Sequence, residues 1–530
     1  MAPSRLRWVT LFLLAGLAGA GGAAATPTAG RTPDPGAITL PQGYRIEAVV
    51  TNLSVPTTLR FAGNDLVVAE SGWADTARPR VLRISLDGRV EVLAGDGLRG
   101  PVTGLLFLNG LLYVSHRGRV SVVENGRIAR DIVTGLPSDG DHQNNQLAAG
   151  PDGRIYMGQG TVTNSAVVGV DNYIFGWLDR APRLHEDPCR DVTLVGENFE
   201  TDNPLTPEDD RAVTGAYKPF GTPSRPGEVV KGNPKCGGSI VRFAPDGSGF
   251  EVVAWGLRNP FGLAFDRAGD LWATFHGADV RGSRSIFNDP DYLVRVREGA
   301  WYGWPEYFAG EPVTARRFAA PTKAAPRFLW REHPPLTRPD FTFDTHSGVN
   351  GFAFSPGGAF GFDGDAFIAM FGAYVPVATG VNLRPAGYSV VRLDPRTREV
   401  REFASNVLPG PSYLNRSGGF DRPTDVAFGP DQSLYVLDWG SSTVTEKGLE
   451  LVPGTGIVWR IYPESLPAVR RSGPIVVEAV PLPEARRRAQ VRNVREFYEM
   501  VGPSVLLVIG AAALVLVVLA FIVRRRRTAR

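Results

Sequence analysis

A single histidine in a polar turn is the strongest candidate for proton-transfer chemistry in this sequence. His142 stands in Gly140-Asp141-His142-Gln143-Asn144-Asn145, directly before a short strand-like run. A neutral imidazole accepts a proton near pH 7, so a histidine at the mouth of a cavity can act as a general base. From the position alone, a turn histidine bonded to the neighbouring asparagine side chains is an equally good interpretation.

Two further segments place polar groups at comparable positions of a second strand pair. Arg258-Asn259-Pro260 precedes its first strand, and His276-Gly277-Ala278-Asp279 follows its second. If neighbouring strand pairs stand side by side, a base, a cation and an amide meet at one rim, as expected of an active site. An arginine there can bind an anion or stabilise developing negative charge, although bonding to turn carbonyls is its commoner role.

These residues belong to a repeated pattern that spans residues 41–463. Each copy has a short apolar strand, a turn and a second strand, and helical periodicity is absent. The six copies begin at Thr58, Thr103, Gln146, Gly262, Gly351 and Asp425. Small sheets of this kind bury their faces by stacking around an axis. The sequence therefore predicts an all-β, six-bladed β-propeller; the alternative is a set of unrelated hairpins or a sandwich.

The spacing of the copies is irregular, because a long insertion at residues 161–237 separates the third from the fourth. Insertions of this length are usually functional or cover a surface. Both cysteines of the chain, Cys189 and Cys236, lie in it. An exported protein can join them in a disulfide, and two free thiols are the alternative.

The two ends of the chain indicate export and a membrane anchor. Residues 1–25 combine two arginines, a short apolar run and small residues, which is typical of a signal peptide; an N-terminal membrane helix is the alternative. Residues 503–523 are apolar and long enough for a transmembrane helix, and the basic tail 524–530 should stay cytoplasmic. Residues 464–500 read as a linker or stalk. The sequence thus predicts a single-pass membrane protein with an extracytoplasmic propeller.

Charge is distributed unevenly along the chain. The formal net charge is +3, but residues 464–530 hold 12 Arg and 5 Glu, so the exported body is mildly acidic. A mildly acidic body makes nucleic acid an unfavourable partner.

Several motifs together resemble the pyrroloquinoline-quinone (PQQ) dependent glucose and sorbosone dehydrogenases. The first is His142-Gln143 followed by Leu147, Gly150-Pro151-Asp152-Gly153 and Ile155-Tyr156. The others are Gly256-Leu257-Arg258-Asn259-Pro260-Phe261-Gly262-Leu263, Tyr302-Gly303-Trp304-Pro305 and Arg422-Pro423-Thr424-Asp425-Val426-Ala427. The resemblance covers residues 41–463 and implies a six-bladed propeller.

The resemblance also implies roles for individual residues. His142 and Arg258 would be catalytic, with His142 taking a proton from a sugar hydroxyl while hydride passes to PQQ. Residues beside PQQ would be Asn259, His276, Gly277, Ala278 and Arg422. The backbone carbonyls of Gly277 and Ala278 would hold Ca²⁺.

The sequence departs from the family at three of these places. Thr161 follows Gly160 where the family has an acidic residue beside the catalytic histidine. Phe371-Gly372 stands where the family usually places a lysine against PQQ, and Thr424 replaces a second arginine near Arg422. Fewer cationic groups are therefore expected to meet a cofactor with three carboxylates.

The function expected from these observations is that of an extracytoplasmic, membrane-anchored quinoprotein dehydrogenase. It would oxidise aldose sugars or related alcohols or aldehydes and pass electrons to an external acceptor. Two alternatives are a non-catalytic propeller that binds glycans or envelope proteins, and a Ca²⁺-dependent hydrolase or lactonase.

Overall fold

The computed structural model describes residues 30–478, except 74–77, 207–209, 321–323, 374–384, 446–447 and 469–472. The predicted signal peptide (1–25), transmembrane helix (503–523) and basic tail (524–530) lie outside the described residues, as does most of the predicted linker. Within the described ranges, no helix combines the length and the apolar character needed to cross a membrane.

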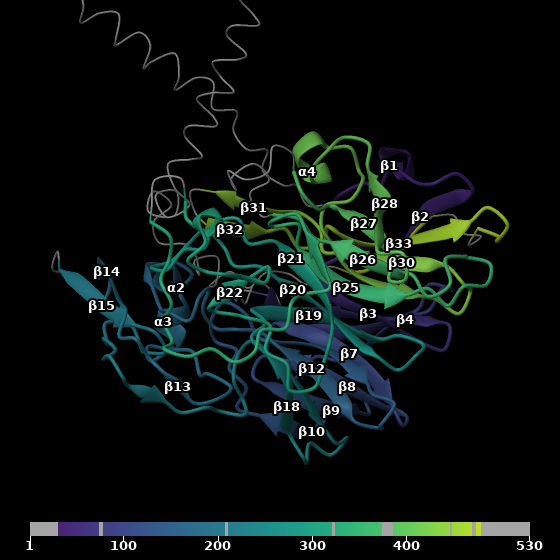
Figure 1. The fold of residues 1–530 in the computed structure, drawn as a ribbon. Coiled ribbons are helices and arrows are strands. Elements are labelled where there is room, and N and C mark those ends of the chain that lie inside the picture. Colours follow the sequence, from purple (N-terminus) through teal and green to yellow (C-terminus); the bar gives the residue numbers. More distant parts are fainter. Residues whose placement is uncertain are drawn as a thin grey trace, which may run out of the picture.

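Six antiparallel sheets surround a central axis, which confirms the predicted six-bladed β-propeller (Figure 1). Blades 1 to 3 are, from the inner to the outer strand, β3 (Pro56–Ala62), β4 (Asp65–Glu70), β5 (Arg80–Ile84), β6 (Val90–Ala94); β7 (Val102–Leu108), β8 (Leu111–His116), β9 (Arg119–Glu124), β10 (Arg127–Thr134); and β11 (Asn144–Ala149), β12 (Ile155–Gln159), β17 (Ser239–Phe243), β18 (Glu251–Trp255). Blades 4 to 6 are β19 (Asn259–Phe265), β20 (Leu271–His276), β21 (Asp291–Arg295), β24 (Phe341–Phe343); β25 (Val349–Phe354), β26 (Ala366–Met370), β27 (Ser389–Asp394), β28 (Glu399–Asn406); and β29 (Pro423–Phe428), β30 (Leu434–Asp438), β33 (Gly456–Pro463), β2 (Tyr44–Leu53).

Strand β4 shows why the blades stack. Leu66 and Val68 are buried in a core shared with blade 6, whereas Val67 and Ala69 are buried in a core shared with blade 2. Successive side chains of a strand point to opposite faces, so an uninterrupted apolar run covers both faces of one blade. Each blade therefore needs a neighbour on both sides, and closing the ring supplies them.

The N-terminal segment closes the ring. Strand β2 forms the outer strand of blade 6 by pairing with β33, and β1 (Ile38–Thr39) pairs with β28 of blade 5. Strand β34 (Ile475–Val476) then pairs in parallel with β2, and the side chains of Ile475 and Val477 are buried beside it. This corrects the predicted linker, because the propeller extends past residue 464 to Val477.

Arg31 fastens this N-terminal segment to blade 6. Its guanidinium lies 2.8 Å from Asp438 Oδ2 and 3.4 Å from Asp421 Oδ2. Both carboxylates have 0% side-chain exposure. Asp438 also accepts the backbone N–H of Arg422 at 2.8 Å. The ion pairs therefore connect the start of the described chain to blade 6, at the turn before β29 and at the end of β30.

The predicted insertion leaves blade 3 between β12 and β17 and folds beside the propeller (Figure 1). Its elements are α2 (Val170–Ile174), α3 (Trp177–Arg180), β13 (Val192–Thr193), β14 (Asn198–Asp202), β15 (Arg211–Gly215) and β16 (Val229–Val230). The remaining short elements are η1 (Pro35–Ala37), β22 (Tyr307–Phe308), β23 (Glu311–Pro312), η3 (Arg316–Phe318), α4 (Ser412–Asn415), β31 (Ser442–Thr445) and β32 (Gly448–Leu451).

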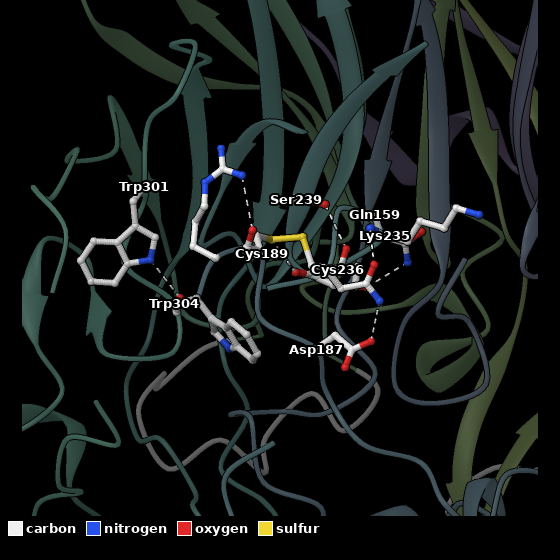
Figure 2. Close-up of a disulfide and its surroundings, with 12 residues drawn as sticks. Gln159, Asp187, Cys189, Lys235, Cys236, Ser239, Trp301 and Trp304 are labelled. Atoms are coloured by element: carbon white, nitrogen blue, oxygen red, sulfur yellow. Dashed lines mark hydrogen bonds between the residues drawn. A yellow bond between two sulfur atoms is a disulfide. The ribbon is translucent and has the colours of Figure 1, made fainter. Parts of the chain in front are cut away.

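Cys189 and Cys236 form a disulfide, as predicted, which joins the middle of the insertion to its end, directly before β17 of blade 3 (Figure 2). The two cysteines are separated by 47 positions, and closing a loop of that size stabilises the folded state by about 4 kcal/mol in the chain-entropy model. Both sulfurs pack in a core that includes Trp301 and Trp304. The aromatic segment at 301–305 therefore serves packing.

Replacing Arg31 with alanine tests the N-terminal fastening. Within the described residues, Arg31 is the only side-chain cation paired with Asp421 and Asp438. Loss of one partner of a buried ion pair leaves an uncompensated charge, so we expect a destabilisation of about 3–5 kcal/mol. Urea unfolding of the purified protein, followed by tryptophan fluorescence, measures it. Arg45→Ala removes an exposed pair with Glu464 and should cost less than about 1 kcal/mol; equal losses for both variants would contradict the interpretation.

Candidate active site

A cavity of about 320 Å³ opens at the rim where inner strands begin and second strands end. Its size is within the range of small-molecule sites. Polar residues of its wall include Asp141, His142, Arg258, Asn259, His276, Asp279, Arg281, Asp291, His346 and Asn350. Aromatic residues of its wall include Trp73, Phe175, Phe261, Phe371 and Trp439. The structure thus brings together His142, Arg258, Asn259, His276 and Gly277 of the predicted site.

His142 reaches the cavity from the turn before β11. Its backbone N–H donates to the carbonyl of Thr161 at 2.9 Å, and its ring Nδ1 lies 3.2 Å from the same oxygen. A proton on Nδ1 suits this carbonyl and leaves Nε2 as the lone-pair atom. Burial lowers the pKa of His142 to about 3, although Asp141 opposes the shift. The ring is therefore neutral at pH 7 with the lone pair of Nε2 unprotonated, and burial keeps its proton affinity low.

A glycine permits this close assembly. A Cβ on Gly160 would lie 2.4 Å from the Cβ of His142 and 2.5 Å from Oδ1 of Asn259. Any larger residue at the end of β12 would separate the histidine from the amide. The backbone pairing that holds Gly160 against Gln143 completes the turn.

Asp141 supplies an acidic neighbour for His142, although Thr161 stands where the family has its acidic residue. Its Oδ2 lies 3.7 Å from Nδ1 of His142. The same oxygen accepts from Arg258 at 2.9 Å and from Arg281. The side chain of Thr161 instead donates to the carbonyl of Thr163. Although burial opposes it, Arg281 holds the pKa of Asp141 below its usual range.

Arg258 and Arg281 form an ion-pair cluster in which Arg258 contacts Asp141 and Asp279, and Arg281 contacts these two and Asp171. Nη2 of Arg258 lies 2.8 Å from Asp279 Oδ2, and Arg281 contacts Asp279 at 3.1 Å and Asp171 at 2.6 Å. Both guanidinium groups are at most 9% exposed. Although burial opposes it, these arginines hold the pKa of Asp279 well below its usual range. The cations of the cavity are thus already paired.

A relay of amides runs around the rim through four blades. Asn145 donates to Oδ1 of Asn259 at 2.7 Å, and Nδ2 of Asn259 donates to Nδ1 of His276 at 2.9 Å. Nε2 of His276 then donates to Oδ1 of Asn350 at 2.8 Å, and Asn350 donates to Thr424. Both ring nitrogens of His276 are therefore engaged. Phe261 stacks on one face of the His276 ring, so this side chain can offer a ligand only its other face.

The predicted calcium ligands do not present a free pair of carbonyls. The carbonyl of Gly277 accepts a hydrogen bond from the guanidinium of Arg258, which opposes a second cation at that oxygen. Ala278 is fully buried and lies behind the cavity wall, where its N–H donates to Asp289. Among the described residues, no group of three or more His, Cys, Asp or Glu side chains could hold a metal ion.

Arg422, predicted beside the cofactor, is also behind the wall. It donates to Ser442 Oγ at 2.6 Å and to the carbonyls of Gly372 and Ala373. Its guanidinium lies over the ring of Phe371, 5.1 Å from the centroid. Phe371 lines the cavity, and Arg422 lies behind its ring.

Three charged residues of this site were given no role from the sequence: Asp141, Asp279 and Arg281. Asp141 and Asp279 were adjacent to predicted residues, so a search for countercharges to Arg258 could have found them. His346 lies 3.3 Å from Asp279. Although burial disfavours a charged ring, its contact with Asp279 raises the pKa of His346.

Substituting His142 with glutamine should change how stability depends on pH. The pKa of His142 is about 3 in the folded protein, whereas an unfolded histidine titrates near pH 6.5. Below about pH 6.5 the unfolded chain therefore binds a proton that the native protein does not. The free energy of unfolding consequently decreases as the pH is lowered. We expect wild type to lose up to about 1.4 kcal/mol per pH unit more than His142→Gln between pH 6 and 5. Urea unfolding at several pH values measures the slopes, and equal slopes would contradict the expectation.

Comparison with known proteins gives the fold and the motifs a context. Residues 200–402 match the family model of glucose/sorbosone dehydrogenases. A 177-residue segment is 27% identical to quinoprotein glucose dehydrogenase B of Acinetobacter calcoaceticus; it makes up 33% of this chain but only 28% of that protein.

Solved structures of low sequence identity were also found. The iodide structure of Trichoderma reesei Carbohydrate-Active Enzymes Family AA12 has a TM-score of 0.50 and 14% identity, and the match covers 82% of this chain and 100% of that one. The PQQ-bound aldose sugar dehydrogenase of Streptomyces coelicolor has a TM-score of 0.46 and 17% identity over 82% of this chain and 99% of that one. The family match at residues 200–402 confirms that this chain resembles the glucose/sorbosone dehydrogenases.

Proposed function

We propose that the protein is a sugar dehydrogenase, which oxidises a sugar or a related alcohol in the rim cavity. The observation that carries the proposal is His142, a neutral imidazole in the cavity wall whose Nδ1 is held by a backbone carbonyl. The family match supports an oxidoreductase. Aldehydes in their hydrated form offer the same hydroxyl group and fit the same chemistry.

The side chains around His142 suit proton transfer from a hydroxyl group. Nε2 accepts the proton, and the ring becomes positively charged. Asp141, 3.7 Å away, stabilises that charge, while the Thr161 carbonyl keeps the ring oriented. Oxidation also removes a hydride from the carbon that carries this hydroxyl group. The hydride needs an electron acceptor, which the described side chains do not themselves supply.

PQQ is the acceptor that the family resemblance suggests, but the charges of the cavity do not fit it as they stand. PQQ carries three carboxylates. The described wall holds three carboxylates of its own, on Asp141, Asp279 and Asp291, and its two guanidinium groups are both paired. The aromatic wall suits a flat ring, whereas the paired arginines offer no free cation.

The location of the reaction is also part of the proposal. The signal peptide and transmembrane helix expected from the sequence would hold the propeller outside the membrane, with electrons leaving to an external acceptor. This placement rests on residues 1–25 and 503–523.

A second candidate function is sugar binding without chemistry. Paired charges, amide groups and aromatic rings in one cavity are the groups that bind an uncharged polyol, and they need no cofactor. A metal-dependent hydrolase has no comparable support among the described residues.

Dye reduction with a panel of sugars distinguishes the two candidates. We expect wild type to reduce an artificial electron acceptor when PQQ and Ca²⁺ are supplied at concentrations that offset weak binding. His142→Gln should lower the rate by about 100-fold or more, because general-base catalysis is lost. His185→Gln changes an exposed histidine of the insertion and should leave the rate unchanged. Tight sugar binding by wild type without dye reduction would favour the second candidate.

A separate titration tests whether the ion pairs oppose the cofactor. We expect PQQ to bind wild type weakly and Asp279→Asn at least about tenfold more tightly, because the change frees charge-assisted donors of Arg258 and Arg281. Quinone absorbance, measured with and without Ca²⁺, gives both affinities. Tight binding by wild type with no gain in the variant would show that the ion pairs are no obstacle.

A further inference from the structure

The insertion contributes its own residue to the wall of the cavity. Phe175, which caps the C-terminus of α2, is half-buried and lines the cavity. Gly176 follows it with a φ of +73°, a left-handed conformation that glycine adopts without strain. This turn brings Trp177 back over Phe175, with ring centroids 4.9 Å apart and planes inclined by 21°.

Arg281 fixes this aromatic pair relative to the rest of the site. Its guanidinium lies 5.5 Å from the centroid of Phe175 and 5.8 Å from that of Trp177. The same group contacts Asp171 of α2 at 2.6 Å and also binds Asp141, the neighbour of His142. One buried side chain therefore holds the insertion, the ion-pair cluster and the turn of the proposed base in a single arrangement.

A second aromatic group lies on other blades of the ring. Trp73, Phe371 and Trp439 follow the second strands of blades 1, 5 and 6, and Trp439 contacts both other rings at centroid distances of 5.5 and 5.4 Å. Phe175 is instead tied to blades 3 and 4 through Arg281 and Asp141. Because blades follow one another around the axis, the two aromatic groups belong to different sides of the cavity.

We propose that Phe175 is a specificity-determining residue on which the ring of a pyranose stacks. The C–H face of a pyranose is apolar and flat, so it buries well against an aromatic ring, while its edge hydroxyls can reach the amides and ion pairs of the rim. A linear polyol has the same hydroxyls but no rigid face. The inference rests on the proposed binding of a sugar in this cavity and assigns its stacking surface to Phe175.

Isothermal titration with glucose, methyl glucoside and glucitol tests the inference on the full-length protein. We expect Phe175→Ala to weaken binding of the two pyranose ligands about 3- to 10-fold and to leave the weaker binding of glucitol unchanged. Phe175→Trp should restore pyranose binding. Phe175→Leu fills most of the space without a ring face, so it should behave like the alanine variant.

Phe199→Ala is the matched control. Phe199 lies on β14 of the same insertion, is half-buried and does not line the cavity. It should bind all three ligands as wild type does. Pyranose affinity unchanged in Phe175→Ala, or lowered equally in Phe199→Ala, would overturn the inference.

The same titrations separate this inference from the proposed oxidation. Pyranose binding that depends on Phe175, in a protein that reduces no dye, would support the inference and remove the dehydrogenase. Wild type that binds none of the three ligands would overturn both.

Discussion

The site depends on the mutual neutralisation of buried charges where blades 3 and 4 meet the insertion. Arg258 and Arg281 are at most 9% exposed, and each would be costly to bury alone. Asp141, Asp171 and Asp279 compensate them through short ion pairs. These pairs have two consequences for the geometry. They hold Asp141, and with it His142, at the rim, and they hold α2 and Phe175 against the propeller.

The propeller explains why residues so distant in sequence meet in one cavity. Asn145, Asn259 and Asn350 each stand at or near the start of an inner strand, and the inner strands all begin at the same rim. A hydrogen-bond relay from Asn145 to Thr424 therefore connects four blades. Such a relay fixes the orientation of His276 because its two nitrogens have different partners. The blades supply a rigid frame, and the turns between them supply the chemistry.

The repeat and the placement of His142, Arg258 and His276 could be predicted from the sequence, because strand periodicity and motif order are local properties. What the side chains do there could not. Arg422 follows the family pattern in sequence, yet Phe371 separates it from the cavity, a packing outcome that no spacing reveals. The sequence has Thr161 where the family has an acid beside the catalytic histidine, so no acidic partner was expected for His142. Asp141 provides one, because the turn before β11 folds its carboxylate beside the ring. The role of Phe175 was also hidden, since it depends on contacts with Arg281 from another blade.

The base and the ion pairs form one electrostatic system. Burial is the main reason that His142 stays neutral, and the positive charges of Arg258 and Arg281 add to it. An anion that bound beside either arginine and left Asp141 in place would offset that positive charge, so it would raise the proton affinity of His142. An uncharged sugar leaves the pairs intact and meets a neutral base. The proton affinity of His142 is therefore set by what else occupies the cavity, and a substrate alone cannot reproduce the state that an anionic cofactor would create.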